Sequence, residues 1–216
     1  MFACRILLIL LSIGLLVSAV PVVQAITFGS PIRITTNSGD SLWPSVAASG
    51  SYVYVARQDS TPVSGSGGQP EIWLRVSSNN GASFGPPIRI STNSYVSCVP
   101  SVAASSNYVY VAWMDYTPVS GSGTEPEIWL RVSSNNGASF GSAIRISTNT
   151  YESVYPSVAA SGSYVYVVWQ DDTPVSGSGY WPEIWLRVSS NNEATFGSAI
   201  RMSTNAYGSP VSGSGS

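Results

Sequence analysis

The chain has 216 residues, of which 44% are hydrophobic, 11% aromatic and 9% charged, and its formal net charge is −2. This composition excludes a highly charged disordered chain and a polytopic membrane protein. The absence of histidine and lysine excludes Ser-His-Asp and Cys-His catalytic groups and the common zinc sites. The slight negative charge offers no electrostatic footprint for nucleic acid.

Residues 1–25 have the pattern of a signal peptide. An apolar run follows Arg5 and extends to about Val20, and Val23 and Ala25 put small residues at the −3 and −1 positions of a cleavage site. An uncleaved anchor helix is the alternative, but the run is shorter than the roughly 20 residues that span a bilayer. We therefore expect a protein that is secreted or displayed on the extracellular surface, with no membrane association after cleavage.

Cys98 is the one cysteine beyond this segment. An exported chain with a single cysteine cannot have an internal disulfide framework. A reactive thiol needs a neighbouring base or cation, and the sequence around Cys98 supplies neither. We therefore expect a small buried or half-buried side chain.

An internal repeat organises the rest of the chain. The segment 44–49 returns at Pro100 and Pro156, and the run 71–76 returns with the same offset of 56 residues. Such self-similarity predicts a tandem architecture. The predicted boundaries are residues 26–43 for the outer strand of a partial unit and a linker, 44–99, 100–155 and 156–204 for three full units, and 205–216 for a Gly/Ser-rich tail.

Each unit has four segments with the period-two hydrophobic alternation of strands. In the first unit these are residues 45–49, 52–57, 71–77 and 88–91, and the polar stretch 59–70 separates the second from the third. Four antiparallel strands in tandem, with apolar residues on both sides, predict blades that pack against one another as in a β-propeller. The predicted fold is all-β, with three full four-stranded blades and one orphan N-terminal strand, incomplete as a single chain.

The turn between the third and fourth strands carries the most specific motif. Residues 77–84 read S-x-N-x-G-x-S-F, residues 133–140 repeat this pattern, and residues 189–196 depart from it by placing Glu193 at the glycine position. The motif resembles the Asp-box, or BNR, repeat of sialidases and related β-propellers, with Asn where that family usually has Asp. The box residues are Ser77, Asn79, Gly81, Phe84, Ser133, Asn135, Gly137, Phe140, Ser189, Asn191 and Phe196.

The resemblance implies a sialidase-like β-propeller in which the box supports the fold and lies away from the active site. The glycine position requires a positive φ, so Glu193 is expected to strain its turn.

Antiparallel order places the loops between the second and third strands, and the linkers between units, at the opposite end from the box. The candidate ligand residues on that end are Arg57, Asp59, Asp115, Asp171, Tyr95, Tyr151, Glu152, Tyr180 and Trp181. Aromatic rings beside carboxylates are typical of sugar binding. The structural alternatives are that Trp113 and Trp169 pack between blades and that the three aspartates cap Asx-type turns.

The resemblance also raises the question of sialidase chemistry, because family members hold the sugar carboxylate with an arginine triad. Two sets of arginines recur at equivalent repeat positions: Arg75, Arg131 and Arg187, and Arg33, Arg89, Arg145 and Arg201. A catalytic site is asymmetric about its substrate, so these arginines are better explained as structural, stacking on tryptophans or pairing with Glu71, Glu127 and Glu183. No catalytic residue, metal ligand or cofactor follows from the sequence.

Three hypotheses for function remain. The first is a secreted or cell-surface module that binds glycans or surface proteins without its own catalysis. The second is a fragment of an exo-α-sialidase-type glycoside hydrolase, and the third is a structural surface or adhesion repeat. Three blades and an orphan strand do not close a ring, which leaves three explanations: a truncated fragment of a longer protein, a homodimer that closes a six-bladed ring, and an open three-blade array, which its exposed edges make the least favoured.

Overall fold

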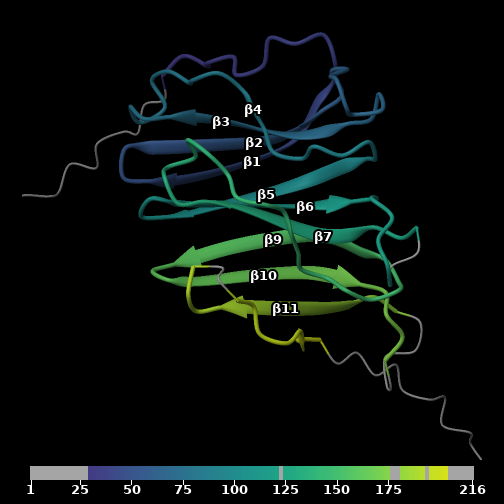
Figure 1. Ribbon diagram of the computed structural model, residues 1–216. Coiled ribbons are helices and arrows are strands. Elements are labelled where there is room, and N and C mark those ends of the chain that lie inside the picture. The colour runs from purple at the N-terminus through teal and green to yellow at the C-terminus, as the bar shows by residue number, and fades with distance from the viewer. Residues whose placement is uncertain (1–28, 122–123, 176–180, 193–194, 204–216) are drawn as a thin grey trace, which may run out of the picture. The chain divides into compact units, whose positions relative to one another are not determined.

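Three four-stranded sheets contain all the strands of the described residues (Figure 1). The computed structural model describes residues 29–121, 124–175, 181–192 and 195–203. The chain divides into two units, residues 1–32 and 33–216, and every sheet belongs to the second. The predicted signal peptide, Tyr180 and Glu193 lie outside the described residues. Within the described ranges, no helix has the length and apolar character needed to cross a membrane.

The strands of each sheet follow one another in sequence order, and neighbours are antiparallel. The first sheet consists of β1 (Ser41–Ser49), β2 (Tyr52–Asp59), β3 (Glu71–Ser77) and β4 (Ile88–Arg89). The second consists of β5 (Ser97–Ser105), β6 (Tyr108–Asp115), β7 (Glu127–Ser133) and β8 (Ile144–Arg145). The third consists of β9 (Ser153–Ser161), β10 (Tyr164–Asp171), β11 (Glu183–Ser189) and β12 (Ile200–Arg201). This confirms the predicted all-β class and the four-stranded antiparallel unit.

The first strand of each sheet begins earlier than predicted because it contains a bulge. The pairing of β1 with β2 shifts register between Leu42 and Ser45. Trp43, inside this shift, has a φ of 51°, which is uncommon for a residue other than glycine, and Pro44 has no N–H to donate. A bulge lets pairing resume beyond such residues, whereas the predicted strand began only after the proline, at Ser45.

The last strand of each sheet is shorter than predicted. After β4, the N–H groups of Ile90 and Ser91 both point to the Ile72 carbonyl, at 2.7 and 3.4 Å. The N–H of Ile72 in turn donates to the side-chain oxygen of Ser91 at 2.8 Å. The serine hydroxyl therefore replaces a backbone partner, and the regular ladder ends after two residues.

Two sets of connections gather at opposite ends of each sheet. At the turn end, the Asn80 N–H in the β3–β4 turn donates to the Ser51 carbonyl in the β1–β2 turn at 2.8 Å. At the loop end, the Ser97 N–H of the second sheet donates to the Pro70 carbonyl of the β2–β3 loop at 3.1 Å. The structure thus places the Ser-x-Asn turns and the long loops at different ends, as antiparallel order requires.

The Ser-x-Asn turns are held by side chains that replace backbone partners. Ser77 Oγ accepts the Gly81 N–H at 2.9 Å, and Asn79 Oδ1 accepts the Ser83 N–H at 2.9 Å. Gly81 has a φ of 82°, a conformation that favours glycine. The same bonds occur at Ser133–Ser139, and in the third sheet Thr195 donates its N–H to Asn191 Oδ1 at 3.0 Å.

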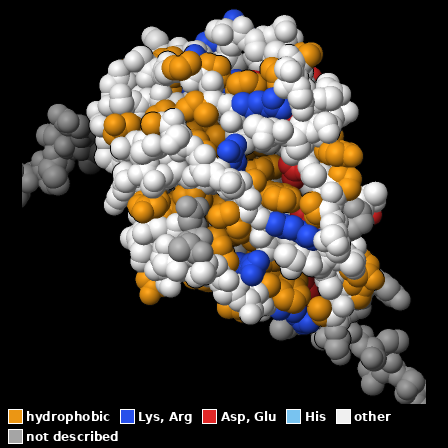
Figure 2. Space-filling view, in the orientation of Figure 1, with side chains coloured by type: hydrophobic (Ala, Val, Ile, Leu, Met, Phe, Trp, Pro, Cys, Tyr) orange, Lys and Arg blue, Asp and Glu red, His pale blue; other side chains and the backbone are white. Residues whose placement is uncertain are grey.

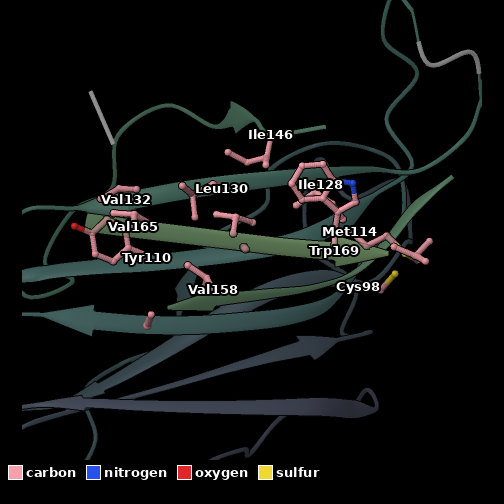
Figure 3. Close-up of a cluster of buried hydrophobic side chains, with 14 residues drawn as sticks. Cys98, Tyr110, Met114, Ile128, Leu130, Val132, Ile146, Val158, Val165 and Trp169 are labelled. Carbon is pink, nitrogen blue, oxygen red and sulfur yellow. The ribbon is translucent and has the colours of Figure 1, made fainter. Parts of the chain in front are cut away.

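Successive sheets pack face to face around two hydrophobic cores. Tyr54, Ile72 and Leu74 of the first sheet are fully buried against Val111 and Trp113 of the second. The core between the second and third sheets repeats this arrangement with equivalent residues (Figure 3), including Tyr110, Ile128, Leu130, Val158, Val165 and Trp169. The apolar residues on both faces of each strand are explained by this packing.

Hydrogen bonds with a fixed spacing also join the sheets. The Val102 N–H donates to Ser45 Oγ at 3.0 Å, and the Val158 N–H donates to Ser101 Oγ at 3.0 Å. Arg131 Nη1 donates to the Ile90 carbonyl at 2.7 Å, just beyond the last strand of the preceding sheet. Each contact recurs one repeat further on, so one set of interactions is used twice.

Candidate ligand-binding site

The structure separates the sequence-predicted ligand residues into a buried and an exposed group. The buried residues are Arg57, exposed by 7%, and Asp59, Asp115 and Asp171, exposed by 1% each. The exposed residues, Tyr95, Tyr151, Glu152 and Trp181, are spread over two linkers and one loop of different sheets. The two groups therefore differ in how accessible they are to a ligand.

The buried aspartates are held by donors from separate segments. Asp115 Oδ2 accepts hydrogen bonds from Trp113 Nε1 at 2.7 Å, Asn93 Nδ2 at 2.7 Å and Ser97 Oγ at 2.8 Å. Its Oδ1 accepts the Thr117 N–H at 2.8 Å, which is an Asx turn. The third sheet repeats the contacts around Asp171 with Trp169, Asn149, Ser153 and Thr173. With both oxygens occupied, each carboxylate positions its neighbours.

In the first sheet, Arg57 has the role that Trp113 and Trp169 have in the second and third sheets. Its Nε lies 3.1 Å and its Nη2 3.0 Å from Asp59 Oδ2. This oxygen is equivalent to Asp115 Oδ2, which Trp113 Nε1 contacts in the second sheet. A guanidinium and an indole N–H thus serve the same buried acceptor. Arg57, which has no arginine counterpart in the other repeats, is therefore explained by its bond to this aspartate.

A pocket lies between each pair of successive sheets. The first inter-sheet pocket, about 330 Å³, is lined by Trp113, Asp115, Thr117, Trp129 and Arg131 of the second sheet and by residues 90–93 that follow the first. The second inter-sheet pocket, about 340 Å³, is lined by the residues 56 positions further on, including Trp169, Asp171, Thr173, Trp185 and Arg187. A smaller pocket of about 160 Å³ occupies the corresponding position beside Arg57 and Trp73.

The inter-sheet pockets contain polar atoms without a partner. In the first of them, Trp129 Nε1 and Thr117 Oγ1 are buried and make no hydrogen bond with a described residue. Trp185 Nε1 and Thr173 Oγ1 are in the same situation in the second. A buried polar group without a partner costs about 1–3 kcal/mol. The same unpartnered groups therefore recur at equivalent positions, where they are available to hydrogen-bond a molecule that enters the pocket.

The arginine in each pocket has no carboxylate partner among the described residues. Arg131 donates through Nε to the Gly141 carbonyl at 2.7 Å and through Nη1 to the Ile90 carbonyl, and no ion pair within the described ranges includes it. Burial lowers the pKa of the Arg131 and Arg187 guanidinium groups from the usual value. The pockets therefore combine two indole rings with a surplus of hydrogen-bond donors.

The arginines of the last strands have a different role. Arg89 pairs with Glu71, and Arg145 Nη2 lies 2.5 Å from Glu127 Oε1. Both glutamates are fully buried, and burial raises the pKa of their carboxyl groups while hydrogen bonds from serine and arginine act in the opposite direction. Figure 2 shows several arginine side chains spaced along one face between hydrophobic side chains. The predicted pairing with glutamate thus belongs to β4 and β8.

Cys98 has the environment of a packing residue. It is 9% exposed and unpaired, and burial raises the pKa of its thiol to about 12, with a further contribution from Asp115.

Over the described part of the chain, no group of three His, Cys, Asp or Glu side chains could hold a metal ion. Burial, followed by Asp172 and Glu125, raises the pKa of Glu152 at the loop end.

The residues that line the pockets most distinctively, Trp129, Trp185, Thr117 and Thr173, are not among the sequence-predicted ligand residues. The alternation of Trp and Arg along β7 was the available signal, since it places both side chains on the face toward the preceding sheet. The missing information was how far the preceding sheet lies from that face.

Comparisons with known proteins agree on the fold. The LVIVD repeat family matches residues 44–61, 98–116 and 156–173, which correspond to much of the first two strands of each sheet. No curated protein matches the chain in sequence.

Solved structures with a similar fold include glycosidases. The Hadza microbial sialidase Hz136 is similar with a TM-score of 0.52 and 12% identity, over 72% of this chain and 36% of that protein. The Penicillium chrysogenum α-L-arabinanase complexed with arabinobiose has a TM-score of 0.51 and 16% identity, over 70% and 45%. The Trypanosoma rangeli sialidase in complex with sialic acid has a TM-score of 0.50 and 12% identity, over 73% and 30%.

The chain thus spans less than half the length of these structural relatives. At such identities the likeness concerns the fold alone. Together with the repeat match, it defines the chain as a β-propeller repeat protein whose three described sheets do not close a ring.

Proposed function

We propose that this chain is an exported carbohydrate-binding module built from Asp-box-type β-propeller repeats, and that the two inter-sheet pockets are its binding sites. The observation that carries the proposal is their recurrence. Among the described residues, each pocket combines two tryptophans, an arginine without a carboxylate partner, and an indole N–H and a threonine hydroxyl that make no hydrogen bond. Aromatic faces stack on the apolar faces of sugar rings, while polar groups bind the hydroxyl groups.

The donor surplus favours a particular kind of sugar. Asp115 and Asp171 already accept four hydrogen bonds each, so they have little capacity left for sugar hydroxyl donors. Of the other pocket groups, the Trp129 indole N–H and the Arg131 guanidinium donate hydrogen bonds to ligand oxygens and accept none. A saccharide with a carboxylate fits this balance better than a neutral one. The saccharide complexes among the fold relatives are a further reason to begin the ligand search with sugars.

The proposal predicts two equivalent sites that can be closed one at a time. Ser142 and Ser198 are exposed residues on the rims of the two pockets, so Ser142→Phe should fill the first pocket with little effect on the fold. A glycan array of neutral and carboxylated saccharides would select a ligand, and calorimetry would measure its stoichiometry. We expect two sites in the natural chain, one in Ser142→Phe and none in Ser142→Phe/Ser198→Phe.

Controls separate pocket binding from other effects. Ser134→Phe, at an exposed position of the turn end, should leave both sites intact, and Trp129→Phe should weaken one site roughly fivefold through loss of one hydrogen bond of about 1 kcal/mol. Binding that survives filling of both pockets would refute the proposal. Turnover of a fluorogenic sialoside would favour the hydrolase-fragment hypothesis instead.

A further inference from the structure

The outer face of the third sheet is apolar and uncovered. Ile184 is 40% exposed, although its repeat equivalents Ile72 and Ile128 are fully buried by the next sheet. The third sheet thus has the same surface that the first two sheets bury against a neighbour.

The outer face of the first sheet is the complementary surface. Val46 is 68% exposed, whereas its equivalents Val102 and Val158 are 5% and 8% exposed because each packs on the preceding sheet. The side chains that would enter a preceding sheet are therefore present at one end of the array, and the surface that would receive them is present at the other.

The inter-sheet hydrogen bonds also have unused partners at the two ends. Ser45 and Ser101 each accept a backbone N–H from the next sheet. Ser157, the equivalent residue of the third sheet, is exposed, and its side chain makes no hydrogen bond with another described residue. The N–H that corresponds to those of Val102 and Val158 belongs to Val46.

We propose that a second copy of this chain docks with the outer face of its first sheet on the outer face of the third sheet. The contact repeats the one that the chain makes twice internally, with Val46 packed beside Ile184 and its N–H bonded to Ser157. It is a head-to-tail contact, since the two surfaces differ. Two copies joined by two such contacts form a ring of six sheets, within the range of propellers.

The docked copy also brings the residues that correspond to the last strand of a preceding sheet. Arg75 Nη1 donates to the Ile34 carbonyl at 2.5 Å, in the way that Arg131 contacts Ile90, so Ile34 already lies where the residue after the last strand of a preceding sheet would lie. In sequence, residues 32–34 read Ile-Arg-Ile, as β4 and β8 with their next residue do. In the complex they replace β12 beside β11.

One feature of β11 supports this replacement. Glu183 Oε1 is buried and accepts no hydrogen bond from a described residue, and the nearest nitrogen of Arg201 in β12 is 3.9 Å away. The equivalent Arg145–Glu127 distance is 2.5 Å. In the complex, Arg33 of the docked copy takes the position that Arg145 has beside Glu127.

Sedimentation equilibrium of the chain without residues 1–25 tests the proposal. We expect twice the chain mass at micromolar concentration, and the monomer mass for both Val46→Asp and Ile184→Asp. Because the contact is head to tail, an equimolar mixture of these variants retains one intact contact and should form a one-to-one complex. Tyr95→Asp, an exposed change at the loop end, should sediment as the natural chain does.

Two outcomes would overturn the proposal: a monomeric natural chain at tens of micromolar, or a dimer that withstands both substitutions. Far-UV circular dichroism and melting temperature establish that each variant is folded. The exposure of Val46 and Ile184 in the single chain makes loss of the fold by either substitution an unexpected result.

Discussion

Replacing Asp115 by alanine is expected to lower the free energy of unfolding by about 3–5 kcal/mol, the range for removal of one partner from a buried charged network. The change removes the acceptor of four hydrogen bonds from Trp113, Asn93, Ser97 and Thr117. Their donors come from the linker, two strands and a loop, so no single local movement can satisfy them all. Chemical denaturation followed by tryptophan fluorescence measures the effect.

Asp40→Ala is the matched control for this prediction. Asp40 is exposed at the loop end, and its side chain makes no hydrogen bond within the described ranges. Its removal should change the free energy of unfolding by no more than about 0.5 kcal/mol. Equal, small effects of the two substitutions would show that Asp115 does not anchor the segments as described.

The second large effect is expected for Leu130→Ala, which should cost about 2–5 kcal/mol. Leu130 is fully buried and packs against the third sheet with Val158 and Val165. Leu186 occupies the equivalent position of the third sheet, where no further sheet covers it, and it is half-buried. Leu186→Ala should therefore cost clearly less than Leu130→Ala.

The comparison is best made in the Val46→Asp background, where the docking contact proposed above is absent. Denaturation curves of the two variants then report the packing within one chain. A cost for Leu186→Ala as large as that for Leu130→Ala would mean that the faces of the second and third sheets are covered to the same extent, contrary to the packing described.

The sequence predicted the sheets well because strand periodicity and the repeat are local signals. The segment 71–77 was predicted with the bounds that β3 has, since alternating Ile, Leu and Val end at a turn motif. The start of β1 was missed because the bulge at Trp43 depends on pairing with β2, which no local pattern records. Arg57 was predicted to be a ligand residue. Its burial could not be predicted, because it depends on Asp59 and on the segment that covers it.

The inter-sheet pockets could not be predicted from the sequence, for a related reason. Trp129 and Asn93 belong to different sheets, and their common pocket depends on the distance between two packed faces. Repeat spacing indicates which residues are equivalent, but it contains no information about the space left between units. The short last strands, which end where a serine side chain replaces the backbone ladder, contribute to that space.

The most direct test of the central claim is the indole N–H region of the nuclear magnetic resonance spectrum during titration with the saccharide selected on the array. The chain has seven tryptophans, and single Trp→Phe variants assign their signals. We predict that the Trp129 and Trp185 signals shift together, because ligand oxygens accept hydrogen bonds from these two donors in equivalent pockets. Shifts confined to the exposed Trp43 and Trp181 would place the ligand elsewhere and contradict the account.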